Sequence, residues 1–549
     1  MAVTYMKRLE EEPDTYDEKF TNLTKGINLE VFNWILGNLE DEDTSILEVG
    51  CGTGNLSANI AKSKRNVIAI DQNIDMINFA MSKYPTDIEG TLLYQLGNFK
   101  NLPVEDNTQD VIISTFMLSE LRPLEQQILL QNAWKALKHD GKLIIAAEFV
   151  PLGIWQLGFK IKRWRYRRKL RRLKIKSTKL VKYFLDYVEP IGFSLIKKKE
   201  WKHGSIQALE LIKCNNNSAK PGYYKPPHKK FKGILSQFRI YRCTLTGQVD
   251  RVPIQPGIYQ SGNPNRSSPI LVTANYDFTY IKLMRDLKGI DAWVLVLDTD
   301  GINVWCAARG NDFGNNQLLE AVEATGIQNY VDHKKLILPQ LSAGGISIPQ
   351  LQKQFPFKIK YGPVWSKYLL EYIEEKPSKK PDKMKLAKFN LYHRIRAGTT
   401  HTTFLLRKIF IYPFLIAFLG LLSSLYWTNK LTWLVYFLSW IIISNGIISI
   451  LFPLSNFTRK FILKGTFFGI VNLILLGAIT MILHQSLLFT ILNLPFFYWV
   501  SFFSTMSFSG YTMATAPREI QGEYPLFKQM NKILMIIAII STTIGILIY

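Results

Sequence analysis

The sequence predicts a multidomain protein with two α/β (Rossmann-like) cytoplasmic domains followed by an all-α membrane domain of five transmembrane helices. Short apolar runs alternate with helix-length stretches in two separate regions of the first 408 residues. From Ile409 to Tyr549 nearly every residue is apolar, apart from short charged interruptions. A chain of 549 residues of which 47% are hydrophobic is too long for one ordinary domain and too apolar to be disordered.

Residues 1–213 form the first predicted α/β domain. Its strand-like runs are expected in a parallel sheet, at 45–50, 66–71, 110–115 and 141–148. A linker rich in Asn, Pro and Lys follows at 214–232, because that composition cannot form a core.

Residues 233–375 form the second predicted α/β domain. Its strands are expected at 268–275, 291–298, 302–308 and 334–341, and its helices near 279–289 and 315–326. A basic connector at 376–408 then leads to the membrane region.

The membrane domain, 409–549, contains five stretches that each approach the roughly 20 residues that a spanning helix requires. They are expected at about 409–427, 431–452, 465–483, 487–508 and 531–549. Basic residues such as Arg459, Lys460 and Arg518 concentrate in alternate loops, and the N-terminus lacks a secretory apolar stretch. We therefore expect a multi-pass protein of the cell (inner) membrane, with both α/β domains cytoplasmic and the C-terminus outside.

The formal net charge is +24, and residues 160–176 contain eleven Lys or Arg and no acid. Such a run beside a membrane domain favours contact with anionic membrane lipids, over a merely solvated face or a nucleic-acid site. Four cysteines lie far apart without CxxC spacing, so the sequence predicts neither a disulfide framework nor an iron–sulfur cluster.

A glycine-rich loop follows the first predicted strand, in the segment ILEVGCGTGNLS. Gly50, Gly52 and Gly54 allow the backbone to approach a ligand closely, and Asp71 ends the next strand, where a carboxylate can accept bonds from ribose hydroxyls. A dinucleotide dehydrogenase shares this pattern. Glu48 before the first glycine and the segment GNFKNLPVED favour another class.

With these motifs, residues of about 15–213 resemble the class I S-adenosylmethionine-dependent methyltransferases. The resemblance implies that Glu48 and the three glycines face the methionine part of the cofactor and that Asp71 holds its ribose. Asn98 stands where that family usually has an acid for the adenine. No residue indicates a methyl acceptor, and a domain that has lost its activity remains an alternative.

A second candidate site centres on Cys306, in the segment AWVLVLDTDGINVWCAARGNDFG. Residue type alone favours a buried structural cysteine. The small residues Ala307 and Ala308 after it are expected to leave a flat opening beside the sulfur, suited to a large planar ligand.

The wider context resembles the HgcA family, the corrinoid proteins of bacterial mercury methylation, over about 233–549. The motif NVWCAA, the segments HKKLILPQLSAGG and KIKYGPV, and MSFSGYTMATAPREIQGE before the last span carry this resemblance. It implies a cobalamin-type corrinoid with Cys306 as the lower axial ligand of cobalt. The cap helix under the corrin ring would comprise Asn303, Val304, Trp305, Ala307 and Ala308, with Thr273 close beneath the ring.

One departure from that family is Arg309-Gly310 in place of Gly-Lys. The resemblance implies methyl transfer from cobalt to Hg(II), with a separate ferredoxin-like iron–sulfur protein, similar to HgcB, as electron donor. Two alternatives stay open: a corrinoid carrier or sensor without mercury chemistry, and a membrane-tethered S-adenosylmethionine methyltransferase acting on a lipid, quinone or other small molecule. Direct loading of the corrinoid by the first domain is a further possibility, against a folate-type donor.

Overall fold

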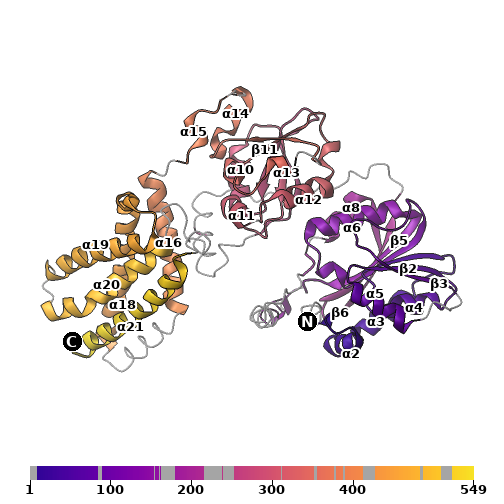
Figure 1. Cartoon of the computed structure of the whole chain (residues 1–549), viewed down its shortest axis with the longest axis horizontal. Coiled ribbons are helices and arrows are strands. Elements are labelled where there is room, and N and C mark those ends of the chain that lie inside the picture. Colours follow the sequence, from indigo (N-terminus) through magenta and orange to yellow (C-terminus); the bar gives the residue numbers. More distant parts are fainter. Residues whose placement is uncertain are drawn as a thin grey trace. The chain divides into compact units, whose positions relative to one another are not determined.

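The computed structural model describes residues 9–84, 90–163, 180–214, 253–411, 427–482, 486–507 and 522–548, apart from a few positions within these ranges (Figure 1). The chain divides into two compact units. Unit 1 comprises residues 1–229 and 253–378 and contains both α/β sheets, whereas unit 2 comprises 230–252 and 379–549.

The first sheet has seven strands in the order β3-β2-β1-β4-β5-β7-β6. The first five strands in this order, β3, β2, β1, β4 and β5, are parallel to one another. Strand β7 runs antiparallel to β5, and β6 runs antiparallel to β7. The predicted parallel sheet is therefore incomplete, because two C-terminal strands extend it in the opposite sense. The strands are β1 Ser45–Val49, β2 Asn66–Asp71, β3 Thr91–Leu96, β4 Gln109–Thr115, β5 Leu137–Glu148, β6 Phe193–Trp201 and β7 Ile206–Lys213.

Helices cover this sheet, because its central strands are apolar on both sides. The buried side chains form two clusters, one containing residues of α6 and α8 and the other residues of α3, α4 and α5. The helices of this part are α2 Pro13–Thr24, α3 Ile27–Leu36, α4 Asn55–Ala61, α5 Ile74–Lys83, α6 Pro123–Ala136 and α8 Phe184–Ile191, with the 3-10 turn η2 Met117–Ser119.

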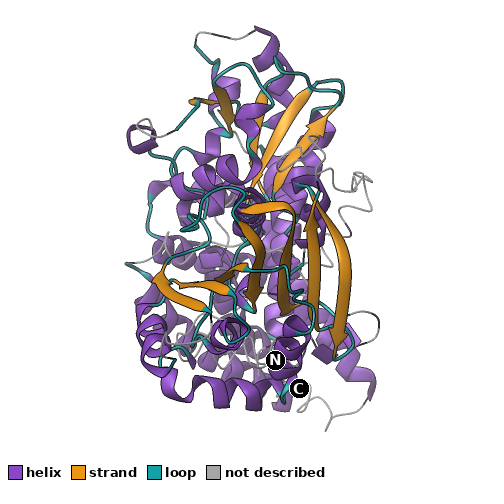
Figure 2. Ribbon diagram, turned by 90° about the vertical axis from the view of Figure 1, so that its right-hand side faces the viewer, coloured by secondary structure: helices purple, strands orange, loops and turns teal. Residues whose placement is uncertain are grey.

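The second sheet has five strands in the order β12-β11-β9-β10-β8, parallel except for β8 at one edge. The strands are β8 Gly257–Ser261, β9 Ile270–Ala274, β10 Ala292–Leu297, β11 Lys335–Leu338 and β12 Lys358–Tyr361. The helices are α10 Asp277–Asp286, α11 Val304–Gly310, α12 Asn315–Thr325, α13 Ile348–Leu351 and α14 Leu369–Glu375, with the 3-10 turns η3 Ile327–Asn329, η4 Gln340–Ser342 and η5 Ser366–Tyr368. Figure 2 distinguishes the strands of the α/β unit from its helices.

The predicted strand at 302–308 is wrong. The residues from Val304 to Gly310 form α11, and Asn303 caps this helix by accepting a hydrogen bond from the Cys306 N–H at 3.0 Å. An asparagine before a short segment with two alanines favours a helix start, and this signal outweighs the apolar run.

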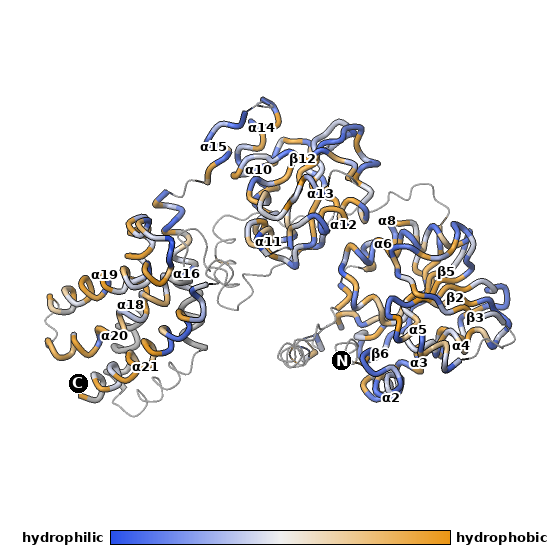
Figure 3. The backbone as a smooth tube through the Cα atoms, viewed as in Figure 1, coloured by the Kyte–Doolittle hydropathy of each residue, from blue (hydrophilic) through white to orange (hydrophobic). Residues whose placement is uncertain are grey.

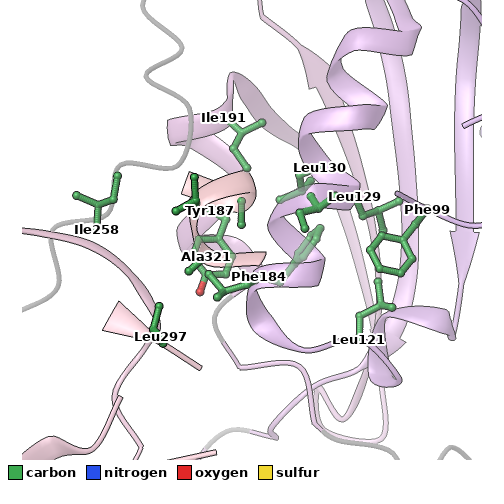
Figure 4. Close-up of a cluster of buried hydrophobic side chains, with 14 of the residues drawn as sticks. Phe99, Leu121, Leu129, Leu130, Phe184, Tyr187, Ile191, Ile258, Leu297 and Ala321 are labelled. Atoms are coloured by element: carbon green, nitrogen blue, oxygen red, sulfur yellow. The ribbon is translucent and has the colours of Figure 1, made fainter. Parts of the chain in front are cut away.

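Helix α12 of the second α/β part packs against α6 of the first, within unit 1. Ala321 of α12 belongs to the same apolar cluster as Leu129 of α6 and Tyr187 of α8 (Figure 4). Arg122, just before α6, forms an ion pair with the buried Glu320, and Gln131 Nε2 donates to the Ala324 carbonyl at 2.7 Å. The two α/β parts therefore share an apolar and polar interface.

Unit 2 consists of helices, namely α15 Asp382–Lys385, α16 Leu391–Ile411, α18 Trp427–Leu451, α19 Phe461–Ile482, α20 Leu487–Ser507 and α21 Tyr524–Ile548, with the 3-10 segment η6 Phe452–Phe457. In its described part, four helices are long and apolar enough to cross a membrane (Figure 3). They correspond to the second to fifth predicted spans. Most of the first predicted span, at 409–427, and most of the segment 506–523 lie outside the described residues.

Most of the basic run at 160–176 also lies outside the described residues. Arg163 is described, and it is buried in an ion pair with the equally buried Glu148 of β5. This guanidinium therefore stabilises the first α/β part, so not every charge of the run is available to lipid headgroups.

Replacing Arg122 with Ala is expected to lower the free energy of unfolding of unit 1 by about 1–3 kcal/mol, because Glu320 would remain buried without its guanidinium partner. The measurement is urea unfolding of the detergent-purified chain, followed by circular dichroism. Lys138→Ala, which removes a pair with Asp110 from a side chain that is 43% exposed, is the control and should change stability far less. Equal losses in both variants would contradict the structural role of the Arg122–Glu320 pair.

Candidate functional sites at the two sheet edges

The glycine-rich loop connects β1 to α4 and depends on backbone that only glycine adopts easily. Gly50, Gly52 and Gly54 have φ values of +81°, +54° and +75°. A Cβ on Gly50 would lie 2.9 Å from the Met117 sulfur, and a Cβ on Gly54 would clash with the Tyr94 ring. The loop therefore needs glycine for its conformation and for the close packing of Met117 and Tyr94.

Asp71, at the end of β2, holds this loop in place. Its Oδ2 accepts a hydrogen bond from the Gly52 N–H at 3.0 Å, and its Oδ1 accepts one from the Asn73 N–H at 2.8 Å. Burial raises the pKa of this carboxyl, although both backbone hydrogen bonds oppose the shift. Each carboxylate oxygen has a second lone pair, so Asp71 can also accept a ligand hydroxyl.

Glu48 lies on β1 and is fully buried, where it accepts a hydrogen bond from the Ser57 hydroxyl of α4. Burial raises its pKa to about 8. The carboxyl is therefore mostly protonated at neutral pH in the ligand-free protein.

One pocket brings most of the predicted S-adenosylmethionine residues together. It has a volume of about 1020 Å³, including the part open to solvent, and its walls include Glu48, Gly50, Gly52, Asp71 and Asn98. Gly54 does not line it but caps the N-terminus of α4. The Asn98 amide oxygen accepts the Lys100 N–H at 2.9 Å. The glycine cradle and the carboxylate at the end of β2 fit a nucleoside ligand.

Helices α2 and α3 provide the other half of the pocket, which the sequence did not predict. Tyr16, Asp17 and Phe20 come from α2 and Phe32 from α3. Asp17 accepts a hydrogen bond from the Thr53 hydroxyl at 2.6 Å and pairs with Lys83 at 2.9 Å. Burial, followed by nearby carboxylates, raises the pKa of Tyr16. No local motif marks these residues, since only the fold brings the N-terminal helices to the glycine loop.

Cys306 lies in the first turn of α11, after the loop that leaves β10. The Asn303 amide Nδ2 lies 3.4 Å from the Cys306 sulfur and donates to it, while Asn303 Oδ1 accepts the Cys306 N–H at 3.0 Å. One side chain therefore fixes both the backbone and the sulfur. A donor to sulfur stabilises the thiolate, which is the form that binds a metal.

Asn275, which follows β9, shapes the loop that leads to Cys306. Its Oδ1 accepts hydrogen bonds at 2.9 Å from the Thr299 N–H, the Thr299 hydroxyl and the Gly301 N–H. Gly301 has a φ of +74°, and a Cβ there would lie 2.7 Å from the Pro253 nitrogen. The loop is therefore held by a buried amide on the neighbouring strand.

The predicted flat opening made by Ala307 and Ala308 differs from what the structure shows. Both alanines are buried, together with Val304, and a Cβ on Gly345 would lie 2.9 Å from the Ala308 Cα. The small side chains therefore allow the segment around Gly345 to pack closely against α11. Cys306 and Trp305 lie instead on the half-exposed side of α11, and Arg309 lies 4.4 Å from the Trp305 ring.

The residues around Cys306 fit a corrinoid. The Cys306 thiol is partly buried with an amide donor on its sulfur, which suits a side chain that would hold the cobalt of such a group. Thr273 is buried at the end of β9, the strand on which α11 packs. Asn303, Val304, Trp305, Ala307 and Ala308 would form the helix turn beneath the group, with the alanines packing its inner side.

Two family models match parts of the chain. The model described as a methyltransferase domain matches residues 46–141, and the model of the CO dehydrogenase/acetyl-CoA synthase delta subunit matches residues 234–353. The chain therefore carries a methyltransferase domain and a domain similar to that delta subunit.

Curated relatives match a part of the chain. The gamma subunit of the acetyl-CoA decarbonylase/synthase complex of Methanopyrus kandleri is 36% identical over 104 residues, which are 19% of this chain and 22% of that protein. The corresponding subunit of Archaeoglobus fulgidus is 29% identical over 153 residues, 27% of this chain and 31% of that protein. The chain thus spans less than a third of the length of these relatives.

Solved structures similar to this chain include methyltransferases. An S-adenosylmethionine-dependent methyltransferase of Methanosarcina mazei is 20% identical, with a TM-score of 0.27 and coverage of 33% of this chain and 97% of that one. The magnesium protoporphyrin IX methyltransferase of Synechocystis is 18% identical, with a TM-score of 0.27 and coverage of 34% and 80%.

Asp71→Asn is expected to weaken S-adenosylmethionine binding about 10- to 100-fold, because a charged acceptor for ligand hydroxyls becomes a neutral amide. Isothermal titration calorimetry with the purified full chain measures this change. Asp75→Asn, an exposed position in the first turn of α5, is the matched control and should bind like the wild type. Unchanged affinity in Asp71→Asn would exclude this carboxylate from the binding site.

Glu48→Gln is expected to change how stability depends on pH. Because the pKa of Glu48 is raised from 4.5 to about 8 on folding, the folded state binds the extra proton, and stability falls as pH rises between these values. A neutral glutamine removes this loss, so the melting temperature of the variant relative to the wild type should increase steadily from pH 5 to pH 8. A constant difference across this range would show that Glu48 is ionised in the folded protein.

Proposed function

We propose that this chain is a membrane-bound corrinoid methyl-transfer protein that methylates Hg(II) to methylmercury and carries a fused S-adenosylmethionine-dependent methyltransferase domain. The observation that carries the proposal is Cys306 on the half-exposed side of α11, with the Asn303 amide donating to its sulfur. The match of residues 234–353 to a corrinoid-protein subunit supports the same site.

The chain's own residues have clear tasks in this proposal. Asn303 fixes the position of the Cys306 backbone and donates to the sulfur, which favours the thiolate over the thiol. Asn275 holds the preceding loop, so the sulfur is positioned before any ligand arrives. When bound, the corrinoid supplies cobalt as the methyl carrier, and a thiolate ligand increases its electron density more than water or imidazole would.

The methyltransferase domain supports a second methyl-transfer site in the same unit. Its pocket joins the glycine loop and Asp71 to aromatic and acidic side chains of α2 and to Phe32 of α3, which are the side chains available to contact an acceptor. The acceptor would be a lipid, a quinone or another small molecule, or the corrinoid of the same chain.

The four apolar helices support anchoring in the cell (inner) membrane, with the α/β parts on the cytoplasmic side by the positive-inside rule. The described residues include no group of three or more His, Cys, Asp or Glu side chains placed to hold a metal ion. Within the proposal, electrons come from a separate ferredoxin-like iron–sulfur protein similar to HgcB, and anionic lipids contact the basic segments.

A corrinoid carrier or sensor without mercury chemistry is the second candidate, and Arg309 favours it. The guanidinium lies 4.4 Å from the Trp305 ring, next to Cys306, where the HgcA family has Gly-Lys. A bulky planar cation stacked beside the site changes how an acceptor approaches.

Cys306→Ala is expected to remove sulfur from the cobalt coordination sphere, because no other described cysteine lies in α11. The experiment reconstitutes the full chain with cobalamin and records cobalt X-ray absorption, in which the wild type should show cobalt–sulfur scattering that the variant lacks. Cys214→Ala, at the end of β7, is the matched control and should keep the wild-type spectrum.

Methylmercury formation from a labelled methyl donor, in cells that also express the ferredoxin partner, separates the two candidates. The methylating function predicts labelled methylmercury with the wild type and at least a 100-fold lower yield with Cys306→Ala. A wild type that shows cobalt–sulfur scattering but forms no methylmercury would identify the carrier or sensor. A wild type without cobalt–sulfur scattering would exclude both.

A further inference from the structure

Unit 2 contains a set of buried polar side chains that the proposed function does not use. They come from four helices, α16, α18, α19 and α20, and face one another in the interior of the helical unit. We call this set the polar track, and its members are His401, Ser444, Asn445, Ser449, Asn472, Ser501 and Ser504. Each is at most 3% exposed. Polar groups are rare inside apolar helix bundles, because burying them without a partner costs free energy.

The inner end of the track is Asn472 of α19. Its amide Nδ2 donates to the Ser501 hydroxyl of α20 at 2.6 Å and to the Ser444 hydroxyl of α18 at 3.1 Å. These two hydroxyl oxygens lie 2.9 Å apart. Three helices therefore meet at one hydrogen-bonded group.

The track continues toward the end of α18. Ser504 of α20 donates to Asn445 Oδ1 of α18 and lies 3.4 Å from His401 Nε2 of α16. Arg394 Nε, near the start of α16, donates to the Ser449 carbonyl at 3.3 Å, two residues before α18 ends. The polar side chains thus extend from the end of α18, where Arg394 lies, into the interior of the helical unit.

The depth of the track follows from helix geometry. Helix α19 has 22 residues and is about 33 Å long at about 1.5 Å per residue. Asn472 lies at its midpoint, so in a spanning helix it would lie near the middle of a hydrocarbon layer about 30 Å thick. The end of α18 and the start of α19 are joined by residues 452–460, which carry Arg459 and Lys460.

Asn472 has one unused hydrogen-bonding group. The side chain is 0% exposed, and its Oδ1 has no hydrogen-bond partner among the residues that the structure describes. Turning the amide around does not remove the mismatch, because the NH2 group would then lack an acceptor. Interhelical hydrogen bonding explains the contacts of Nδ2 with the two serines, but it does not explain an unmatched atom at the same residue.

We propose that the polar track is a hydrated site, open toward the Arg459 side of the helices and ending at Asn472, where a small neutral hydrogen-bond donor, water in the first instance, binds Oδ1. Serine, asparagine and histidine side chains provide neutral oxygen and nitrogen atoms, and no acid belongs to the track. It therefore suits water and uncharged solutes of similar size, and not a divalent cation, which needs carboxylates.

The proposal requires the helices to span the membrane, as the proposed function does, and the experiment keeps these two questions apart. Each of the four native cysteines is replaced by serine, and Asn472→Cys is introduced into the full chain. Leu476→Cys is the matched control, one turn along the same helix, equally buried at 0% exposure and apolar in surroundings. Ser444→Cys gives a second position in the track if the first variant does not accumulate.

The measurement is the rate of modification by methyl methanethiosulfonate, a small uncharged reagent, in membrane vesicles. This reagent reacts with the thiolate, which forms only where water reaches the thiol. We expect Asn472→Cys and Ser444→Cys to react at least 10-fold faster than Leu476→Cys.

Each outcome is decisive. Integration into the membrane with equal, slow reaction at all three positions would make the track a dry packing contact and overturn the proposal, while leaving the membrane anchor intact. Equal, fast reaction at all three would show an open or unfolded bundle and overturn it as well. A chain that alkaline carbonate extracts from the membrane fraction would contradict the anchor and, with it, the track.

Discussion

Both sites in unit 1 depend on one geometric constraint, namely that the carboxyl ends of neighbouring parallel strands lie at the same edge of a sheet. In the first sheet this edge brings together the glycine loop after β1, Asp71 at the end of β2 and Met117 after β4. In the second it places Asn275 after β9 beside the loop after β10, which ends at Cys306. Functional loops that are far apart in sequence therefore meet, and each is held by a polar side chain from the adjacent strand.

The sequence allowed prediction of those parts of the fold in which local signals agree. The strands around Glu48 and Asp71 were predicted closely, because apolar runs, glycines and turn residues coincide there. The segment 302–308 was assigned to the wrong element, since an apolar run of this length fits a strand and a buried helix equally well. The antiparallel strand β6 was missed because it is mostly exposed, with three consecutive lysines, and shows no apolar face. Its partner β7 was missed although its side chains are almost all buried.

Only those residues of the candidate sites that belong to a sequence motif could be predicted. Glycines and the carboxylate that follows them have fixed spacing, whereas Tyr16 and Phe32 reach the pocket from helices that precede the motif and carry no signal of their own. The burial of Ala307 and Ala308 could not be predicted from the sequence, because a small side chain can either leave a surface open or allow another segment to pack closely against it. Both alanines are buried, and the chain at Gly345 packs closely against Ala308. Buried polar residues in an apolar span are visible in the sequence, but their convergence on Asn472 depends on how the helices rotate.

Asn275 and Asn472 are both buried asparagines, but they differ in how completely their side-chain amides are hydrogen-bonded. This difference distinguishes an amide that only supports a loop from one that can still bind a ligand. The Asn275 oxygen accepts three hydrogen bonds and its NH2 group donates to the Ile254 carbonyl and to Asp298, so every hydrogen-bonding group of this side chain is used. The Asn472 NH2 group is matched in the same way, while its oxygen has no partner in the described part of the chain. A fully matched amide stabilises the loop around it, whereas a buried amide with one unmatched end favours any small donor that reaches it. The first arrangement positions the Cys306 thiol for a ligand outside the fold, and the second leaves a place for a ligand within it.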